Sequence, residues 1–273
     1  MLSGLLVLVF AALPEDQESV RKHIMDHYIA GMYTGRDAQA MRAGFHPQFR
    51  MIVWWEGQLT LRPRDAWIDK VTSNPRPTPE KIAATRVEIP LVWVVGDAAA
   101  ARIEIYRGEQ HRYTDFFTLY RIDGQWQVMA KTFHYHPGTT GPKRAIAAEQ
   151  AAVENLIEAR YMMGFARGFK ADSMRKGFHR DFRMATWWQN ELTLKGRETW
   201  IGKITQGKAK PDHRAKWSWQ IPQVEVAGDA ALARIELSHD GHLMFTDFFL
   251  LYRFPEGWRV VEKAFHYVPK PES

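Results

Sequence analysis

Apolar residues recur at helical spacing in two stretches of the chain that lie 133 positions apart. The positions are Val20, Ile24, Tyr28 and Gly31 in the first stretch, and Val153, Ile157, Tyr161 and Gly164 in the second. A spacing of three to four residues places these side chains on one face of a helix. Each half of the chain is therefore predicted to begin with an amphipathic helix, followed by a short second helix capped by Asp37 or Asp172.

Further along each half, the pattern changes to runs rich in β-branched and aromatic residues. In the first half these runs predict strands over 49–55, 58–61, 86–95, 98–106, 111–122 and 125–135, with a third helix over 62–71. Asp123-Gly124 is a strong hairpin signal, and Gly96-Asp97 predicts a similar turn. Strands that follow the helices rather than alternate with them indicate an α+β fold with a mainly antiparallel sheet.

The two halves are copies of one module. Residues 44–61 match residues 177–194 at 11 of 18 positions, and Gly96-Asp97-Ala98-Ala99 returns as Gly228-Asp229-Ala230-Ala231. A repeat with a period above 100 residues indicates a duplicated domain. We expect domains over residues 15–137 and 145–270, joined by a Pro- and Gly-containing linker over 138–144.

Residues 1–13 form an apolar run that is too short to cross a bilayer. The run resembles the hydrophobic region of a signal peptide, although no Lys or Arg precedes Arg21. Either the true start lies upstream or the signal is atypical. The sequence favours a secreted or periplasmic protein without stable membrane insertion, and a buried N-terminal element of a cytoplasmic protein is the alternative.

The formal net charge of +6 is spread over the whole chain rather than gathered in one stripe. Nucleic-acid binders more often concentrate their basic residues, so no nucleic-acid partner is predicted. The chain contains no cysteine, which excludes disulfides, thiolate metal sites and a cysteine nucleophile. No glycine-rich phosphate loop is present either, and we expect no cofactor.

Several motifs occur in both copies. These are a helix that ends in Tyr-x-x-Gly, a Phe-His pair, a Gly-Asp-x-Ala turn, the strand Thr-Asp-Phe-Phe-x-Leu-Tyr-Arg, and a closing Trp-x-Val-x-x-Lys-x-Phe-His. Together they resemble the nuclear-transport-factor-2-like superfamily, and within it the lumazine-binding and SnoaL-like groups. The resemblance implies a cone-shaped α+β barrel with an apolar cavity in each copy, often paired through the outer face of its sheet. One chain could then form an intrachain pseudo-dimer of its two domains.

Asp115 and Asp247 lie inside otherwise apolar strands. A carboxylate that faces an apolar cavity can act as a general base, and the SnoaL-like resemblance implies such a role for an acidic residue on a late strand. The alternative is an Asp that forms hydrogen bonds with a neighbouring strand or pairs with Arg102. The ketosteroid-isomerase pattern implies a role for Tyr28 and Tyr161, but its base on an early strand has no counterpart here.

Four histidines are candidate ligand-binding groups. His46 and His179 follow a Phe, and could serve as pocket groups or as caps of a helix C-terminus. His134 and His266 close the last strand of each copy, where strand alternation groups His134 with Trp126 and Val128. His136 shares that face, but no further ligand is apparent at a suitable spacing, so no metal site is predicted.

Trp54 and Trp187 are further candidate ligand contacts, since each belongs to a Trp-Trp pair whose members point to opposite faces of a strand. Core packing is the alternative to stacking on a planar ligand. Glu262 stands where the first copy has Ala130, which predicts cavities of different polarity.

The sequence thus favours a non-catalytic protein that binds a small apolar or planar molecule in two cavities. The alternatives are a SnoaL-like isomerase, cyclase or dehydratase that uses Asp115 and Asp247, and an interaction scaffold.

Overall fold

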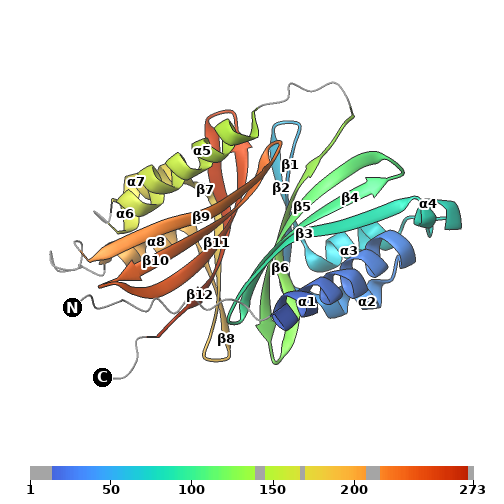
Figure 1. Cartoon of the computed structure of the whole chain (residues 1–273), viewed down its shortest axis with the longest axis horizontal. Coiled ribbons are helices and arrows are strands. Elements are labelled where there is room, and N and C mark those ends of the chain that lie inside the picture. The colour runs from blue at the N-terminus through green and yellow to red at the C-terminus, as the bar shows by residue number, and fades with distance from the viewer. Residues whose placement is uncertain (1–13, 139–144, 167–169, 207–215, 270–273) are drawn as a thin grey trace, which may run out of the picture.

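The structure is a computed structural model, which describes residues 14–138, 145–166, 170–206 and 216–269. Two similar domains lie side by side, each built from a six-stranded sheet with helices on one face (Figure 1). The duplication and the α+β class predicted from the sequence are therefore confirmed.

The first domain begins with a long helix whose second part has π-helical hydrogen bonding. Its helices are α1 (Pro14–His23), η1 (Ile24–Gly35), α2 (Ala38–Gly44), α3 (Arg64–Thr72) and α4 (Pro79–Ala83). Its strands are β1 (Phe45–Trp55), β2 (Gln58–Pro63), β3 (Thr85–Val95), β4 (Ala98–Arg107), β5 (Gln110–Ile122) and β6 (Gln125–Tyr135). Strand boundaries agree with the sequence pattern to within a few residues, apart from an earlier start of β1.

The second domain repeats this order. Its helices are α5 (Ile146–Leu156), η2 (Ile157–Met162), α6 (Met163–Phe165), α7 (Ala171–Gly177) and α8 (Arg197–Gln206). Its strands are β7 (Phe178–Trp188), β8 (Glu191–Gly196), β9 (Trp217–Ala227), β10 (Ala230–His239), β11 (His242–Phe254) and β12 (Gly257–Tyr267).

Each sheet is mixed. The strand order in the first domain is β2-β1-β6-β5-β4-β3, and the second domain repeats it as β8-β7-β12-β11-β10-β9. All neighbouring strands are antiparallel except β1 with β6 and β7 with β12, which are parallel. The curved sheet encloses the first helix of its domain, so the residues between helix and sheet are the ones that can form a cavity.

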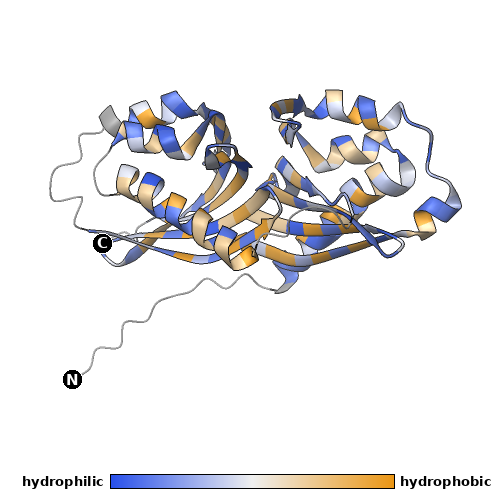
Figure 2. Cartoon of the chain, turned by 90° about the horizontal axis from the view of Figure 1, so that it is seen from above, coloured by the Kyte–Doolittle hydropathy of each residue, from blue (hydrophilic) through white to orange (hydrophobic). Residues whose placement is uncertain are grey.

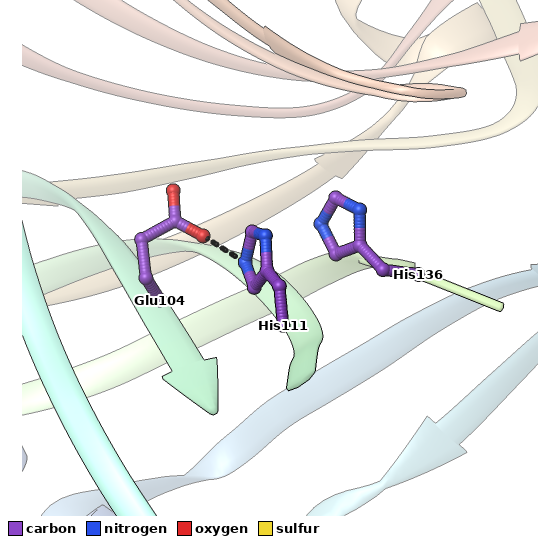
Figure 3. A group of neighbouring side chains, drawn as sticks. All are labelled: Glu104, His111 and His136. Atoms are coloured by element: carbon purple, nitrogen blue, oxygen red, sulfur yellow. Dashed lines mark hydrogen bonds and ion pairs between the residues drawn. The ribbon is translucent and has the colours of Figure 1, made fainter. Parts of the chain in front are cut away.

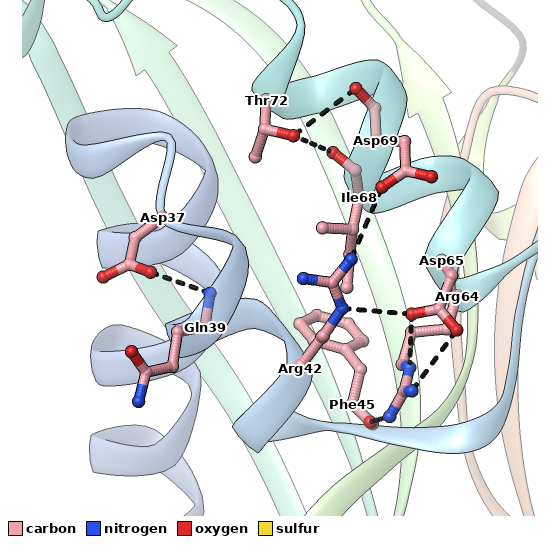
Figure 4. Close-up of polar contacts among 9 residues, drawn as sticks. All are labelled: Asp37, Gln39, Arg42, Phe45, Arg64, Asp65, Ile68, Asp69 and Thr72. Carbon is pink, nitrogen blue, oxygen red and sulfur yellow. Dashed lines mark hydrogen bonds and ion pairs between the residues drawn. The ribbon is translucent and has the colours of Figure 1, made fainter.

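Polar contacts hold the short helices of the first domain in place (Figure 4). Asp37 caps α2 by accepting hydrogen bonds from the backbone of Gln39 (2.8 Å) and Ala40 (3.1 Å), as the sequence predicts. Arg64, at the start of α3, donates to the carbonyl oxygen of Phe45 (3.2 Å). The predicted second cap is wrong, because α7 begins at Ala171 and Asp172 therefore lies inside the helix.

The outer faces of the two sheets pack against each other. One buried apolar cluster contains residues of both domains, including Ile52, Phe116 and Met129 from the first and Phe248 and Val261 from the second. Figure 2 shows hydrophobic residues along the strands where the domains meet. The helices lie on the opposite faces, so the chain forms a pseudo-dimer through its sheets.

Two tyrosines cross this boundary in a reciprocal way. Tyr120 donates to the carbonyl oxygens of Ala185 (2.9 Å) and Phe265 (3.0 Å) in the second domain. Tyr252 donates to the carbonyl oxygens of Ile52 (3.0 Å) and Phe133 (2.9 Å) in the first domain. Both side chains are buried and fully paired, so they fix the orientation of the domains as well as adding apolar contact.

Residues 1–13 and most of the predicted linker, 139–144, lie outside the described residues, so the signal peptide and export stay predictions. Among the described residues, none of the helices is long and apolar enough to cross a membrane.

Candidate functional site

A buried group of three polar side chains lies between the first helix and the sheet of the first domain. The hydroxyl of Tyr28 donates to Oδ2 of Asp115 (2.5 Å), and Nζ of Lys131 lies 2.7 Å from the same oxygen. Lys131 also donates to the Tyr28 hydroxyl. Tyr28 and Asp115 are fully buried and Lys131 is 3% exposed. We call this group the first triad.

The second domain contains the same group. Tyr161 donates to Oδ2 of Asp247 (2.7 Å), Lys263 donates to the Tyr161 hydroxyl (2.9 Å), and Lys263 pairs with Asp247. These three residues form the second triad. Buried charges are rare unless they are paired, and here an ion pair and a phenol contact one another in both domains.

Three different elements supply each triad. In the first domain, the tyrosine lies in the π-helical segment η1, the aspartate in the middle of β5, and the lysine on the neighbouring strand β6. The tyrosine of the second triad also lies in a π-helical segment, η2. Such segments are rare in proteins, and those that occur are often found at functional sites.

Burial sets the electrostatics of both triads. Desolvation and the nearby Asp115 carboxylate raise the pKa of Tyr28 well above its ordinary value, so this phenol stays protonated and donates. Burial lowers the pKa of Lys131, and the attraction of Asp115 opposes that effect. The other carboxylate oxygen, Asp115 Oδ1, is buried and has no hydrogen-bond partner among the described residues, and the same holds for Asp247 Oδ1. Each triad thus keeps one acceptor unused.

A cavity of about 820 Å³ opens beside the first triad, and Lys131 is the triad member that lines it. Its remaining wall is mixed: Met51, Val53, Trp67 and Phe133 are apolar, whereas Tyr33, Tyr113, Arg36 and Arg112 carry polar groups. The size is that of sites for small organic ligands, and the wall combines apolar surface with several polar groups.

At several positions that match this wall, the second domain has more apolar residues. Tyr33 is replaced by Ala166, Arg112 by Met244 and Tyr113 by Phe245. The ring of Phe165 stacks on Tyr161, with the ring centres 5.6 Å apart. The two triads are therefore alike, whereas their surroundings differ.

Comparisons with known proteins agree with the duplicated fold. The family model described as "Putative lumazine-binding" matches residues 15–134 and again residues 148–266. The chain belongs to this family. A curated relative, "Aldolase FrzH" from Cladobotryum sp., is 26% identical over 111 residues, which cover 40% of this chain and 84% of the relative.

Solved structures similar to the chain are NTF2-like proteins of unknown function. One from Shewanella baltica is 24% identical with a TM-score of 0.42, and covers 47% of this chain and 100% of its own. Another, from Methylobacillus flagellatus, is 22% identical with a TM-score of 0.39, and covers 48% of this chain and 100% of its own. The lumazine-binding group implied by the sequence motifs, in two tandem copies, is confirmed by the family model that matches twice.

Within this lumazine-binding-family chain, the structure brings together Asp115 with Tyr28 and Asp247 with Tyr161, four of the residues selected from the sequence. Of the two alternatives for Asp115, a contact with a neighbouring strand is what the structure shows, because Lys131 lies on β6 beside β5. Asp115 does not pair with Arg102, which binds Glu104 and Glu225.

The tryptophan positions need a correction. Trp54 and Trp187 face the other domain and pack against the shared apolar cluster, and the ring of Trp54 lies 4.6 Å from that of Phe254. Trp55 is the member of the first pair that lines the cavity, where it is 50% exposed. The sequence predicts that one member of each pair faces inward but does not show which one.

His46 and His179 lie outside the described cavity. Nδ1 of His46 accepts a hydrogen bond from the backbone of Gln48 (3.0 Å), and Nδ1 of His179 accepts one from Asp181 (3.1 Å). The structure assigns them neither a cavity contact nor a helix cap, but a local role at the start of β1 and β7.

His134 and His266 lie at the boundary between the domains. Gly228 approaches the ring of His134 so closely that an added Cβ would lie 2.0 Å from it, and Gly96 does the same at His266, with 2.1 Å. Both glycines have positive φ, at +53° and +55°. These histidines therefore pack against the turns of the opposite domain, and neither lines the cavity beside the first triad. His266 lines a different cavity, of about 630 Å³, on the outer face of the second sheet.

Glu262 also lies at the domain boundary. It is fully buried, and it accepts hydrogen bonds from Nε of Arg50 (2.9 Å) and Nε of Arg183 (2.9 Å). Its carboxylate thus joins one arginine from each domain. The exchange with Ala130 changes the boundary between the domains and not the polarity of a cavity.

The lysines of the triads were not selected from the sequence, because simple alternation along the last strand fails. Thr118 pairs with Ala130 and Leu119 with Val128, so Met129 is an extra residue, a β-bulge. Beyond the bulge every side chain changes face, and Lys131 turns toward the cavity. A lysine within an otherwise apolar strand was the available signal.

Proposed function

We propose that the first domain binds a small, mostly apolar molecule that carries a carbonyl or other acceptor oxygen. The observation that supports this proposal is the position of Lys131, whose ammonium group belongs to the first triad and lines the cavity. A buried ammonium donor that faces the cavity favours an acceptor oxygen on the ligand. The lumazine-binding family and its fold are consistent with a ligand of this kind.

The ligand contacts divide into two kinds. The rings of Trp55, Trp67 and Phe133 provide apolar area for a planar or aliphatic body. The guanidinium of Arg112 and the hydroxyls of Tyr33 and Tyr113 lie on the same wall and can orient polar substituents. We extend the proposal to the second domain, with a less polar ligand, because its triad is retained and its wall is more apolar.

The proposal is tested by native mass spectrometry of the chain purified from its own source, with the bound mass identified after denaturation. We expect a small organic molecule to accompany the wild-type protein. Lys131→Met replaces the donor by an apolar side chain of similar length, and it should reduce occupancy at least tenfold. Arg50→Lys, a change at the domain boundary, is the control and should leave occupancy unchanged. Wild-type protein that carries and binds no organic molecule would contradict the proposal.

A second candidate function is acid–base chemistry on a carbonyl compound. Two observations favour it: Asp115 contacts Tyr28 and Lys131 inside the fold, and a curated relative is named as an aldolase. The cavity-facing group of this chemistry would be Lys131, whose lowered pKa makes its amine more available at neutral pH. Asp115 lies behind it and would set its charge.

This candidate is tested with acetylacetone, a 1,3-diketone that condenses with a reactive lysine amine, with loss of water, to a conjugated enaminone. We expect the adduct on Lys131, located by peptide mass spectrometry, and no adduct at that position in Lys131→Met. The double variant Asp115→Asn/Asp247→Asn should also lose any turnover once a substrate is known. Wild-type protein in which only exposed lysines react would contradict catalysis by this lysine.

A further inference from the structure

A cluster of three potential metal ligands lies on the outer face of the first sheet, away from the cavity. Glu104 is on β4, His111 is at the start of β5, and His136 follows β6 (Figure 3). One ligand atom from each residue lies within 4.8 Å of the other two. Neither the family nor the proposed function assigns a role to this cluster.

The polar atoms of the cluster converge on one point. Nε2 of His111 lies 2.6 Å from Oε2 of Glu104, and the hydroxyl of Thr114 donates to that same oxygen (2.6 Å). Nε2 of His136 lies 2.9 Å from the Thr114 hydroxyl. The Nε2 atoms of both rings thus lie beside the same small group of oxygens, that of His111 at the carboxylate and that of His136 at the Thr114 hydroxyl. The two rings are stacked, so one of them has to turn before both nitrogens can bind the same ion.

Burial holds the side chains of the cluster in place before any ion is bound. The side chains of Glu104 and His111 are 5% and 29% exposed, and Thr114 is fully buried. The His111 ring is held between Tyr106 and His136, with ring centres 4.6 and 3.7 Å away. The carboxylate is therefore fixed inside the protein, while the partly exposed imidazole leaves a path for an ion.

The positive charge that contacts the cluster, Arg102, is paired with two carboxylates. Arg102 pairs with the other oxygen of Glu104, Oε1 (2.5 Å), and with Glu225 of the second domain (2.6 Å). The guanidinium is thus balanced by two carboxylates, and Oε2 stays directed at the histidines. A partner on the remote oxygen also orients the carboxylate, as outer contacts do in known metal sites.

The second domain shows what the same backbone does without the histidines. Glu236 and Thr246 stand at the positions of Glu104 and Thr114, but the two imidazoles are replaced by Leu243 and Val268. A cavity of about 630 Å³ is lined there by all four residues. The fold therefore tolerates apolar side chains at these positions, and the histidines of the first domain are not required to build the sheet.

We propose that Glu104, His111 and His136 bind one divalent transition-metal ion such as zinc. Two imidazole nitrogens and one carboxylate oxygen are a common set of three protein ligands for zinc, with a fourth position open to water. Tetrahedral ligands at zinc distances of about 2.0 Å lie on the order of 3.3 Å apart, so the 2.6 Å pair has to open by less than about 1 Å. The ion would join β4, β5 and the end of β6 beside the domain boundary.

The test uses untagged protein stripped with a chelator and then titrated with zinc chloride, followed by native mass spectrometry and calorimetry. The wild type should bind one zinc ion per chain, with a rise in melting temperature on zinc addition. His111→Leu/His136→Val carries the residues of the second domain, and it should bind zinc at least about 100-fold more weakly. His27→Gln, a change at a histidine outside the cluster, is the control and should bind like the wild type.

Circular dichroism checks that each variant is folded, and the single variant His136→Val provides the same comparison if the double variant is not. No zinc uptake by folded wild-type protein would overturn the proposal. Unchanged stoichiometry and affinity in the histidine variants would overturn it as well. Cobalt substitution gives an independent readout, because tetrahedral coordination produces visible absorption bands that the double variant should lack.

Discussion

The two domains share their buried ion pair and differ at several of the positions that a ligand or an ion could touch. Tyr28, Asp115 and Lys131 return as Tyr161, Asp247 and Lys263 with the same contacts. The walls beside the triads and the outer faces of the sheets have changed instead. An identical interior with different surfaces indicates that the triad serves something both domains need, whereas specificity belongs to each domain separately.

The largest expected effect follows from separating the charges of a triad. Asp115→Leu leaves Lys131 buried without its counter-ion, and Asp247→Leu does the same to Lys263. Each should lower the free energy of unfolding by about 3–5 kcal/mol, because an uncompensated buried charge is strongly unfavourable. Urea denaturation followed by tryptophan fluorescence measures the loss.

Removing both charges is the matched control. Asp115→Leu/Lys131→Met should recover most of the lost stability, since a buried ion pair can be replaced by apolar side chains at little cost. Equal losses in the two domains would support a shared structural role. A loss below about 1 kcal/mol in either domain would show that its lysine reaches water after the change.

The triads also show which features of the structure can be predicted from the sequence and which cannot. The repeat, the fold class and the order of the elements along the chain follow from periodicity and turn signals, because these depend on neighbouring residues. Alternation also places Asp115 on one face of its strand with Phe117 and Leu119, but it does not show which face is inward. The direction of Lys131 depends on the bulge at Met129, which the hydrophobic pattern does not reveal. The same bulge at Val261 turned Glu262 toward the domain boundary, against the predicted cavity position.

The boundary between the domains contains the next largest difference. Glu262 neutralises Arg50 and Arg183, whereas the related position in the first domain is Ala130, so one carboxylate is shared by these two related arginines. Glu262→Ala should lower the free energy of unfolding by about 3 kcal/mol, because two largely buried guanidinium groups lose their counter-ion. The free energy of unfolding of Glu262→Gln should lie between those of the wild type and Glu262→Ala. A loss below about 1 kcal/mol for Glu262→Ala would mean that backbone carbonyls suffice for the arginines.

Acid should distinguish the domains, because His23 of the first domain corresponds to Leu156 of the second. Burial lowers the pKa of His23 to about 4, so the folded state keeps it neutral while the unfolded state takes up a proton below about 6.5. Stability therefore falls as the pH drops from about 6.5 to 4, by on the order of 3 kcal/mol from this group. His23→Leu should remove that part of the pH dependence, measured by urea denaturation from pH 7 to pH 4.

The control for this comparison is the stability at pH 7, where the His23 imidazole is mostly neutral in the folded and in the unfolded state. There the variant should lose only the hydrogen bond to the carbonyl oxygen of Gly44 (3.0 Å), about 1 kcal/mol. A variant with the same acid sensitivity as the wild type would assign the pH dependence to other groups.

The hydrophobic pattern also does not predict contacts between residues that lie far apart in the sequence. His134 and His266 belong to strands whose outer faces meet the opposite domain, and only the packing of the two sheets brings Gly228 and Gly96 against them. His136 was judged to lack partners at a suitable spacing, yet Glu104 and His111 reach it from neighbouring strands. Spacing along one strand says little about a site assembled across three.

The smallest change in stability is expected when the second domain receives the two histidines of the first. This change is also the sharpest test of the difference between the outer faces of the two sheets. Leu243→His/Val268→His places two imidazoles beside Glu236 and Thr246, in the cavity of about 630 Å³ that already exists there. The backbone at these positions is matched, since Val268 donates to the carbonyl of Met244 (2.8 Å) as His136 does to that of Arg112 (2.9 Å). Without metal the variant should differ from the wild type by less than about 1 kcal/mol, and with zinc it should bind two ions per chain instead of one. A variant that still binds one ion would show that the second cavity is too open to bring the ligands together.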